Sequence, residues 1–135
     1  MIRLLADVNI EGHVARLLAL MQSEFWREFW EYLDIQPYRF PDVQLTRDDS
    51  DARVWQVCQQ MQLYLLTNNR NDDGPDSLEA TIRKHNEVSS FPVFTLSDAD
   101  RVFLDKDYAE RVTDSLYEKL LRIDGLRGTG RLFLP

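Results

Sequence analysis

Short apolar runs alternate along this chain with longer stripes of apolar residues at helical spacing. The runs at 2–6, 63–67 and 92–96 have the length of buried strands and are too short to form helices by themselves. Strands that alternate with amphipathic helices indicate an α/β domain with a central, mostly parallel sheet and helices on both faces. The helical stripes are Val14, Leu17, Leu18 and Met21; Val54, Trp55, Val57, Cys58 and Met61; and Ala109, Val112, Leu116, Leu120 and Ile123.

Weaker signals predict the remaining elements. Residues 43–46 have the composition of a short strand, and Pro75 marks a helix start that leads to about Glu87. The last helical stripe is expected to end near Gly125, because glycine is a common residue just after a helix. The tail at 131–135 either adds an edge strand or packs on a neighbouring molecule.

Side chains that accept hydrogen bonds from backbone N–H groups indicate where the helices begin. Ser23 is the expected cap of one helix, and Asp48 or Asp49 is the expected cap of the helix that follows them. Asp76 lies three residues before Glu79, which is the spacing of a capping box. We therefore assign Asp76 to capping rather than to chemistry.

Residues 25–33 combine helical spacing with a high density of aromatic side chains. A stripe of this kind usually packs into a core, but a contiguous aromatic patch that stays exposed marks a surface for a partner. The sequence leaves both interpretations open. The apolar members of the stripe are Phe25, Trp26, Phe29, Trp30 and Leu33.

Composition limits the class of protein. A chain of 135 residues, 44% of them hydrophobic, has the size of one ordinary domain, so we expect residues 1–135 to form a single domain. Cys58 is the one cysteine and cannot form an internal disulfide, and no apolar run is long enough for a membrane span or a signal peptide. These features favour a cytoplasmic protein without a membrane segment. The net charge of -7 argues against a broad basic face for duplex DNA, but it is compatible with a small, metal-bridged contact with a nucleic-acid strand.

Aspartates follow each of the three predicted strands, and one more begins a predicted helix. Because the carboxyl ends of parallel strands meet at one edge of a sheet, we expect these side chains to come together. A cluster of like charges persists when a cation neutralises it, and Mg²⁺ or Mn²⁺ prefers oxygen ligands of this kind. Such a site supports metal-assisted phosphodiester hydrolysis. The aspartates are Asp7, Asp51, Asp72, Asp73, Asp98 and Asp100.

Each of these aspartates also has an ordinary structural explanation, because Asp and Asn cap helices and occupy turns. Asp7 is the hardest to explain in this way. It ends a buried strand, and Asn9 supplies a second oxygen on the same side of the chain. The joint pattern, rather than any one aspartate, predicts the metal site.

Two stretches carry a family resemblance. The sequence LLADVNIEGHVARLL, followed by DARVWQVCQQMQLYLLTNN and RNDDG, resembles the small PIN-like family of toxin-type ribonucleases and their stand-alone relatives, including the domain of unknown function numbered 5615. Asp7 and Asn9 match the family's first aspartate and asparagine, and Asp51 matches its helix-opening aspartate. The resemblance covers roughly residues 1–75, with a gap at the aromatic stripe. It implies a three-layer PIN-like fold, divalent-metal-dependent ribonuclease activity in active members, and a homodimer or a small antitoxin-like partner protein.

The chain departs from the family pattern in the loop after the strand at 63–67. The aspartates of the family's loop fall on Asn69 and Asn71, whose neutral amides attract a divalent cation far less than carboxylates do. After a small shift of the loop, Asp72 and Asp73 would take over. The predicted catalytic residues are Asp7, Asp51, Asp72 and Asp73, the predicted Mg²⁺ or Mn²⁺ ligands are Asp7, Asp51, Asp72 and Asp98, and the predicted substrate-binding residues are Asn9, Asn69, Arg70 and Asn71.

Three hypotheses follow for function. The first is a metal-dependent nuclease that hydrolyses RNA. The second is a catalytically degraded PIN-like domain that binds protein or nucleic acid, with the helix at 25–33 as its working surface. The third is a phosphoacceptor receiver domain, which also needs aspartates at strand ends but requires a lysine after its last strand, and the sequence PVFTLSDADR provides none.

Other reactive side chains are better explained by structure. His13 and His85 have no Cys or His at zinc-ligand spacing, so we expect them to be surface or capping residues. Cys58 lies on an apolar helical face and is expected in the core. The sequence GLRGTGR lacks the lysine of a phosphate loop. Its surroundings nevertheless hold the densest basic cluster, which is a candidate for contact with phosphate or an acidic partner: Arg122, Arg127 and Arg131.

Overall fold

The centre of the protein is a five-stranded sheet in which every strand is parallel to its neighbours. A computed structural model describes all residues, 1–135, and orders the strands β2-β1-β3-β4-β5. The prediction of an α/β fold with a parallel sheet is confirmed. The strands are β1 (Ile2–Ala6), β2 (Ile35–Tyr38), β3 (Tyr64–Thr67), β4 (Val93–Leu96) and β5 (Arg131–Leu134).

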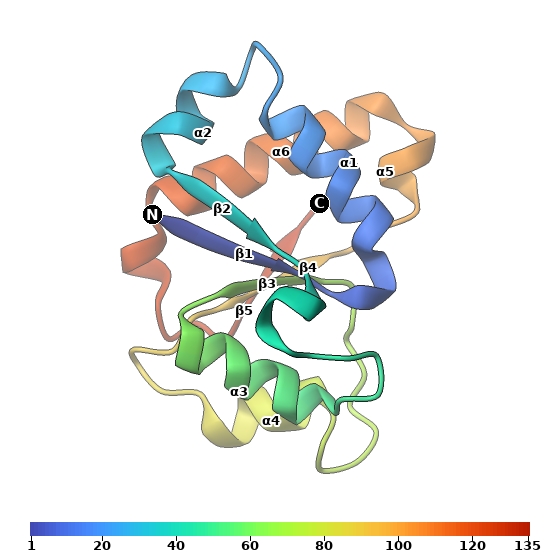
Figure 1. Cartoon of the computed structure of the whole chain (residues 1–135), viewed down its shortest axis with the longest axis vertical. Coiled ribbons are helices and arrows are strands. Elements are labelled where there is room, and N and C mark those ends of the chain that lie inside the picture. Colours follow the sequence, from blue (N-terminus) through green and yellow to red (C-terminus); the bar gives the residue numbers. More distant parts are fainter.

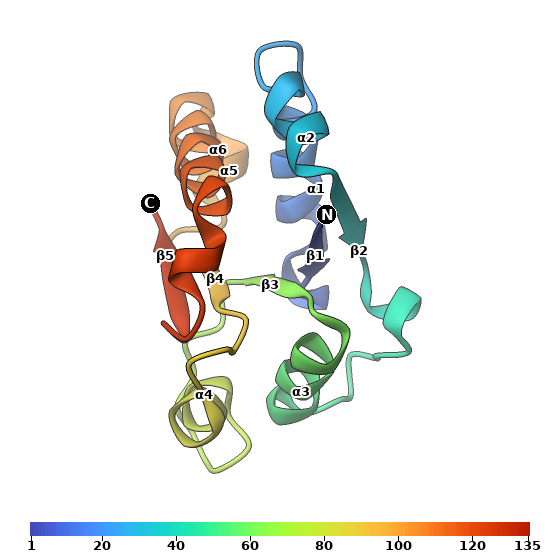
Figure 2. The same ribbon diagram turned by 90° about the vertical axis from the view of Figure 1, so that its left-hand side faces the viewer.

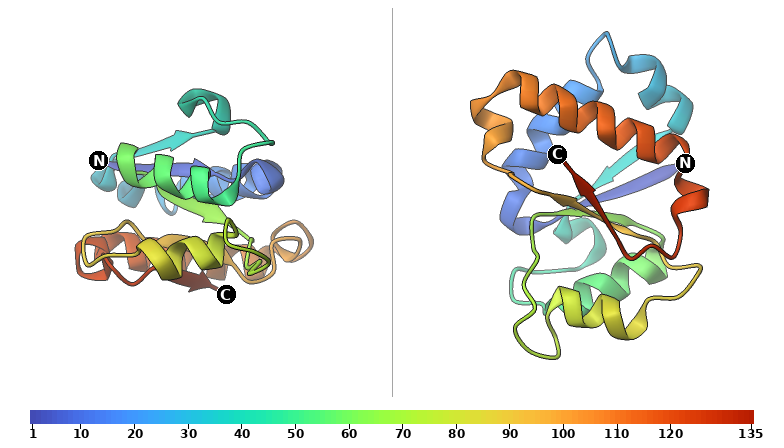
Figure 3. Two further views of the ribbon diagram at one scale, coloured as in Figure 1. Left: turned by 90° about the horizontal axis from the view of Figure 1, so that it is seen from below. Right: turned by 180° about the vertical axis from the view of Figure 1, so that it is seen from behind.

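Helices cover both faces of this sheet, which gives the molecule three layers (Figure 1). One face carries α1 (Glu11–Met21), α2 (Arg27–Leu33), α5 (Arg101–Leu104) and α6 (Lys106–Leu121). The other face carries α3 (Asp51–Met61) and α4 (Leu78–His85), which lie side by side (Figure 3). Short 3-10 turns occupy Val8–Ile10, Phe40–Val43 and Ile123–Leu126.

Alternation along the central strands divides the buried side chains into two cores. In β1, Leu4 packs toward α1 and α6, whereas Leu5 packs toward α3 and α4. In β3, Leu66 and Leu65 divide in the same way. Residues two apart in a strand point to the same face of the sheet, so Thr67 lies on the same face as Leu65. A polar side chain therefore lies on the α3 and α4 face where β3 ends.

The chain leaves the neighbouring strands β1 and β3 toward opposite faces of the sheet. After β1 it enters α1 on one face, and after β3 it enters α4 on the other (Figure 2). In open parallel sheets such a switch point opens a crevice at the carboxyl ends of the two strands, and ligands bind there. The fold therefore places the principal candidate site between the ends of β1 and β3.

The connection from β4 to β5 differs in hand from the other three. It steps across the sheet in the same direction as the connection from β3 to β4, but α6 lies on the opposite face from α4. Crossovers between parallel strands share one hand in nearly all proteins. The edge strand β5 is thus an uncommon addition. Of the two arrangements expected for the tail, the structure shows the edge strand.

The strand predicted at 43–46 is wrong. Residues Phe40–Val43 form a 3-10 turn, and the second strand is Ile35–Tyr38 instead, paired with β1. Pro37 concealed this strand, because proline lacks the N–H that a central strand needs. Strand β2 lies at the sheet edge, where a proline is tolerated.

The predicted caps of α3 and α4 are also wrong, because serines take that role. Ser50 caps α3 and Ser77 caps α4, each accepting from the backbone N–H three residues later. Asp49 instead accepts from the N–H of Thr46 at 2.7 Å, and Asp76 is exposed in the preceding loop. The carboxylates next to these helix starts are therefore free for other contacts or for solvent.

Three further boundaries differ from the sequence prediction. Ser23 donates to the carbonyl of Leu20 instead of capping α2, whose N-cap residue is Trp26. Helix α4 ends at His85 rather than near residue 87. Helix α6 ends at Leu121, and a 3-10 turn continues to the expected region. None of the helices is both long and apolar enough to span a membrane.

Gly128 is a position where the fold requires glycine. Its φ is +87°, and a Cβ there would lie 2.7 Å from the carbonyl oxygen of Val88. We predict that Gly128→Ala lowers the free energy of unfolding by more than about 2 kcal/mol, because it adds both backbone strain and a clash. Urea denaturation at constant m-value measures this loss. Gly125→Ala is the matched control, since its Cβ would meet nothing within 4 Å, and an equal loss there would contradict the explanation.

Cys58 lies in the core as predicted, with 1% of its surface exposed. Burial, with a smaller contribution from the Asp7 carboxylate, raises the pKa of its thiol to about 12. We predict that a disulfide reagent at pH 8 labels the folded protein only as fast as it opens, since the reactive thiolate is scarce. Urea-unfolded protein should react at once. Rapid labelling of the folded protein would contradict this burial.

Candidate functional site

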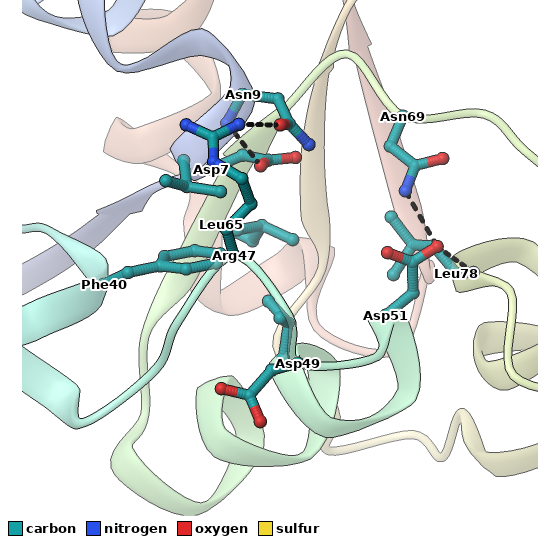
Figure 4. Close-up of a pocket in the computed structure, with 11 residues that line it drawn as sticks. Asp7, Asn9, Phe40, Arg47, Asp49, Asp51, Leu65, Asn69 and Leu78 are labelled. Carbon is teal, nitrogen blue, oxygen red and sulfur yellow. Dashed lines mark hydrogen bonds between the residues drawn. The ribbon is translucent and has the colours of Figure 1, made fainter.

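A small cavity of about 60 Å³ lies at the switch point between β1 and β3 (Figure 4). Its apolar wall comes from Val8, Phe40, Val54, Leu65 and Leu78. Its polar lining brings together residues from the end of β1, the loop before α3, the start of α3 and the loop after β3: Asp7, Asn9, Arg47, Asp49, Asp51 and Asn69. The sequence had predicted Asp7, Asp51, Asn9 and Asn69 for one site, and the structure does bring these four together.

Asp7 is a buried carboxylate with a hydrogen bond to each oxygen. Only 8% of its surface is exposed. Its Oδ2 accepts from the Thr67 hydroxyl at 2.6 Å, and its Oδ1 accepts from the backbone N–H of Asn9 at 3.0 Å. A buried charge is costly unless hydrogen bonds replace its water, and these two bonds do so.

Thr67 connects Asp7 to the loop that follows β3. Its side chain is fully buried. The hydroxyl donates to Asp7 and accepts from the backbone N–H of Asn69 at 3.0 Å. One side chain therefore fixes both the orientation of the Asp7 carboxylate and the first turn of the loop.

Asn69 faces Asp51 with the donor side of its amide. Its Nδ2 donates to Asp51 Oδ2 at 2.9 Å, and its Oδ1 accepts from the backbone N–H of Asn71 at 2.9 Å. The second bond decides the orientation, because only an oxygen can accept from that N–H. Asp51 Oδ2 also accepts from the backbone N–H of Leu78, the first residue of α4, at 3.2 Å.

Arg47 brings a positive charge to the same cavity. Its guanidinium donates to Asn9 Oδ1 at 2.9 Å, as Figure 4 shows. The side-chain oxygen of Asn9 therefore already accepts a hydrogen bond from Arg47 and does not point into unoccupied space. The positive charge of this guanidinium opposes the entry of another cation.

The other predicted ligands lie outside the cavity. Asp72 pairs with Arg83 at 2.9 Å on the surface, and Asp98 is exposed beyond β4. Asp73 is exposed as well, and its backbone N–H donates to Asn71 Oδ1 at 2.8 Å. Two successive turns closed by asparagine side chains, at Asn69 and Asn71, carry the loop outward. The aspartates after the loop therefore do not replace the asparagines, and Arg70 lies exposed in the same loop.

Arg131 is a structural residue of the site that the sequence did not identify. Its side chain is 7% exposed. Its Nη1 donates to the carbonyl of Asn69 at 2.8 Å and to the Thr95 hydroxyl at 2.7 Å, and its Nη2 lies 3.1 Å from Glu79 Oε2. A buried arginine on β5 thus holds the loop that carries Asn69. An arginine beginning an otherwise apolar strand is the sequence signal that pointed to it.

The predicted basic cluster near the C-terminus does not form a common surface. Arg131 is buried at the loop, and Arg122 pairs with Glu118 on α6 at 3.2 Å. Arg127 lies 3.8 Å above the ring of Phe91 and donates to the carbonyl of Ser89. Because each arginine has its own partner, the three do not jointly contact one phosphate.

The two histidines lie outside the cavity. His13 Nε2 lies 2.9 Å from Asp100 Oδ1, and its ring packs on Phe103. His85 packs beside Trp55 on the α3 and α4 face. Both rings therefore have local structural contacts.

The cavity residues do not fit a resident Mg²⁺ or Mn²⁺ ion. No group of three or more His, Cys, Asp or Glu side chains is arranged to hold a metal. Three carboxylates, those of Asp7, Asp49 and Asp51, line the cavity, but hydrogen-bond donors already occupy positions on their oxygens. The donors are the Thr67 hydroxyl, the Thr46 N–H, the Asn69 amide and the Leu78 N–H. Donor groups and a guanidinium are the wrong chemistry for a cation shell.

Comparison with known proteins adds no assignment, since no family model, curated protein or solved structure matches this chain. The PIN-like resemblance therefore stays a prediction. It depends on the motifs around Asp7, Asp51 and Asn69, which the structure gathers in one cavity.

The Thr67 hydroxyl offers a direct test of this network. We predict that Thr67→Val, which keeps the shape of the side chain, lowers the free energy of unfolding by about 2–4 kcal/mol, because it leaves Asp7 Oδ2 and the Asn69 N–H without partners. Chemical denaturation measures the change. Thr67→Ser keeps the hydroxyl and should lose less than half as much. Equal losses in both variants would show that the methyl group, and not the hydrogen bonds, matters.

Proposed function

We propose that this chain is a PIN-like domain that acts by binding a partner protein and does not hydrolyse RNA. One observation carries the proposal. Asn69 presents its N–H₂ group to Asp51, and the bond from Asn71 N–H to its Oδ1 holds it in that orientation. Where the resemblance implies a third carboxylate for a cation, this chain has a hydrogen-bond donor.

The charge balance of the cavity supports this proposal. Carboxylates that line one cavity repel one another unless positive charge or hydrogen-bond donors compensate them. Here the compensation comes from the protein itself, through Arg47, the Asn69 amide and the Thr67 hydroxyl. The arrangement is complete without a cation, and a cation would have to displace at least one of these donors.

The overall charge favours protein over nucleic acid as the partner. The chain has 23 acidic and 16 basic side chains, and its net charge is -7. Nucleic-acid affinity depends largely on lysine and arginine contacts with phosphate. The arginines near the cavity and the C-terminus are mostly engaged within the protein, so they offer little free positive surface.

A metal-dependent ribonuclease is the second candidate. Asp7 and Asp51 line the same cavity, and Mg²⁺ is often held by one or two carboxylates together with waters and substrate phosphates. For this function the Asn69 amide would have to turn its oxygen toward the cavity. That rotation gives up the bonds to Asp51 and to the Asn71 N–H.

Substitution of Asn69 distinguishes the two candidates. We predict that the wild-type protein shows no saturable Mn²⁺ binding by calorimetry and leaves single-stranded RNA intact. Asn69→Asp places a further carboxylate at the cavity, directly beside Asp51, so this variant should melt at lower temperature in EDTA and regain stability with Mn²⁺. Asp72→Asn, which changes a surface carboxylate outside the cavity, is the control and should behave like wild type.

Metal binding and RNA cleavage by the wild-type protein would instead support the second candidate. Wild-type protein that binds Mn²⁺, cleaves RNA, and loses both properties in Asp7→Asn would establish the ribonuclease and overturn the binding role. Thermal melts of each variant show whether a lost activity reflects chemistry or unfolding.

A further inference from the structure

The segment before and within α2 repeats three kinds of side chain in parallel rows. Its sequence, EFWREFWEYL, runs from Glu24 to Leu33. Within α2, residues three apart lie on one side of the helix, so the last two members of each row are neighbours along its axis. The first member of each row lies in the turn at 24–26 that leads into the helix. The inner row is Trp26, Trp30 and Leu33, the aromatic row is Phe25, Phe29 and Tyr32, and the acidic row is Glu24, Glu28 and Glu31.

The inner row attaches α2 to the body of the protein. The Trp26 ring stacks on Tyr117 of α6 with centroids 5.2 Å apart, and its Nε1 donates to Glu110 at 3.2 Å. Trp30 and Leu33 pack against the same core. The inner row, together with Phe29, therefore holds the helix in place, and the remaining side chains of the other two rows face outward.

The aromatic row remains largely in solvent. Phe25 is 80% exposed, Tyr32 is 79% exposed and Phe29 is 38% exposed. The ring of Phe29 lies 5.5 Å from Tyr117, so it stands at the boundary between core and surface. Large aromatic side chains exposed together on one row mark an association surface rather than a solvated face.

The acidic row lies next to the aromatic one. Glu24, Glu28 and Glu31 are all exposed, and none of them forms an ion pair. Arg27 is the single basic residue of α2. Three uncompensated carboxylates beside an apolar row create a negative potential that attracts a cationic partner.

A groove extends the apolar surface beyond the end of α2. It has a volume of about 540 Å³ and runs from Tyr32 to the end of α6. Met1 and Leu121, which are 69% and 46% exposed, contribute to its lining. The aromatic row and this groove meet at Tyr32, so a bound helix would find apolar contacts beyond the length of α2 itself.

We propose that this surface, the aromatic row with the acidic row beside it, binds a basic amphipathic helix of a partner protein. Aromatic rings accept the apolar face of such a helix and also attract its arginine and lysine side chains, while the glutamates pair with its charges. Phosphate-rich RNA and anionic lipid would meet the same glutamates with repulsion. A second copy in a two-fold contact would bring acidic rows together.

This inference names the partner of the proposed binding role and rests on that role, but it uses none of the cavity residues. The groove touches Met1 and Ile2 at the start of β1, whereas the cavity touches Asp7 after its end. The two surfaces therefore lie at opposite ends of β1. A test of one leaves the other intact.

The test uses the full chain and a synthetic helical peptide with leucines on one face and lysines on the other, titrated by calorimetry. We expect saturable binding in the micromolar range that weakens as salt is raised. The double variant Phe25→Ala with Tyr32→Ala should weaken it about tenfold or more. Replacing Glu24, Glu28 and Glu31 by Gln should weaken binding and remove most of its salt dependence.

Matched controls make the result specific. Phe103→Ala removes another exposed aromatic side chain, on α5, and should leave the affinity unchanged. A peptide with glutamates in place of the lysines, and one with scrambled order, should not bind. Because Phe25 and Tyr32 are mostly exposed, their variants should melt within a few degrees of wild type, and melting curves check this.

Several outcomes would overturn the inference. They are absence of peptide binding, equal binding of the glutamate peptide, unchanged affinity in the aromatic double variant, Phe25-dependent binding of anionic vesicles or RNA instead of the peptide, and a Phe25-dependent homodimer in ultracentrifugation. RNA cleavage with Mn²⁺ would overturn the proposed function alone, since the peptide would still bind at α2.

Discussion

The hydrogen bond from Thr67 to Asp7 is the contact on which the centre of this molecule depends. It joins the ends of the two central strands at 2.6 Å, at the point where the chain turns to opposite faces of the sheet. From there the network continues through Asn69 and Asp51 to the first N–H of α4. The strand ends, the start of α3 and the start of α4 are therefore positioned by one continuous set of polar contacts.

Such a network has an electrostatic consequence. Buried carboxylates need compensation, and a protein supplies it either with a bound cation or with its own donors. In this chain Arg47 and the Asn69 amide supply it, and Arg131 reaches across from β5 to hold the loop that carries Asn69. Asn69 presents a nitrogen donor to Asp51, and this donor favours the second of the two solutions.

Much of the fold follows from the apolar pattern, and the exceptions have physical reasons. The strands β1, β3 and β4 are uninterrupted apolar runs, so their positions and parallel arrangement were predictable. Strand β2 was missed because Pro37 interrupts it and because an edge strand does not need every N–H. The serine caps were missed because carboxylates beside Ser50 and Ser77 have equal capping propensity, so that only geometry decides between them.

The site was predictable in part for a similar reason. Asp7 and Asp51 follow from topology, since strand ends and helix starts converge at a switch point. The failure of Asp72 and Asp73 to reach the cavity depends on turns within the loop, which the sequence shows only as a run of polar residues. The role of Thr67 was hidden because a threonine that ends an apolar run has the composition of the strand itself.

The cavity and the aromatic row of α2 lie far apart, so substitutions in one should have little effect on the other. Helix α2 is anchored through Trp26 on Tyr117 of α6, on one face and at one edge of the sheet. The cavity lies at the carboxyl ends of the neighbouring strands β1 and β3, beside the starts of α3 and α4. Residues this far apart, without shared partners, contribute almost independently to stability and binding. A change in the cavity carboxylates should therefore leave the exposed aromatic and acidic rows of α2 intact, because nothing in the packing of α2 depends on Asp7 or Asp51.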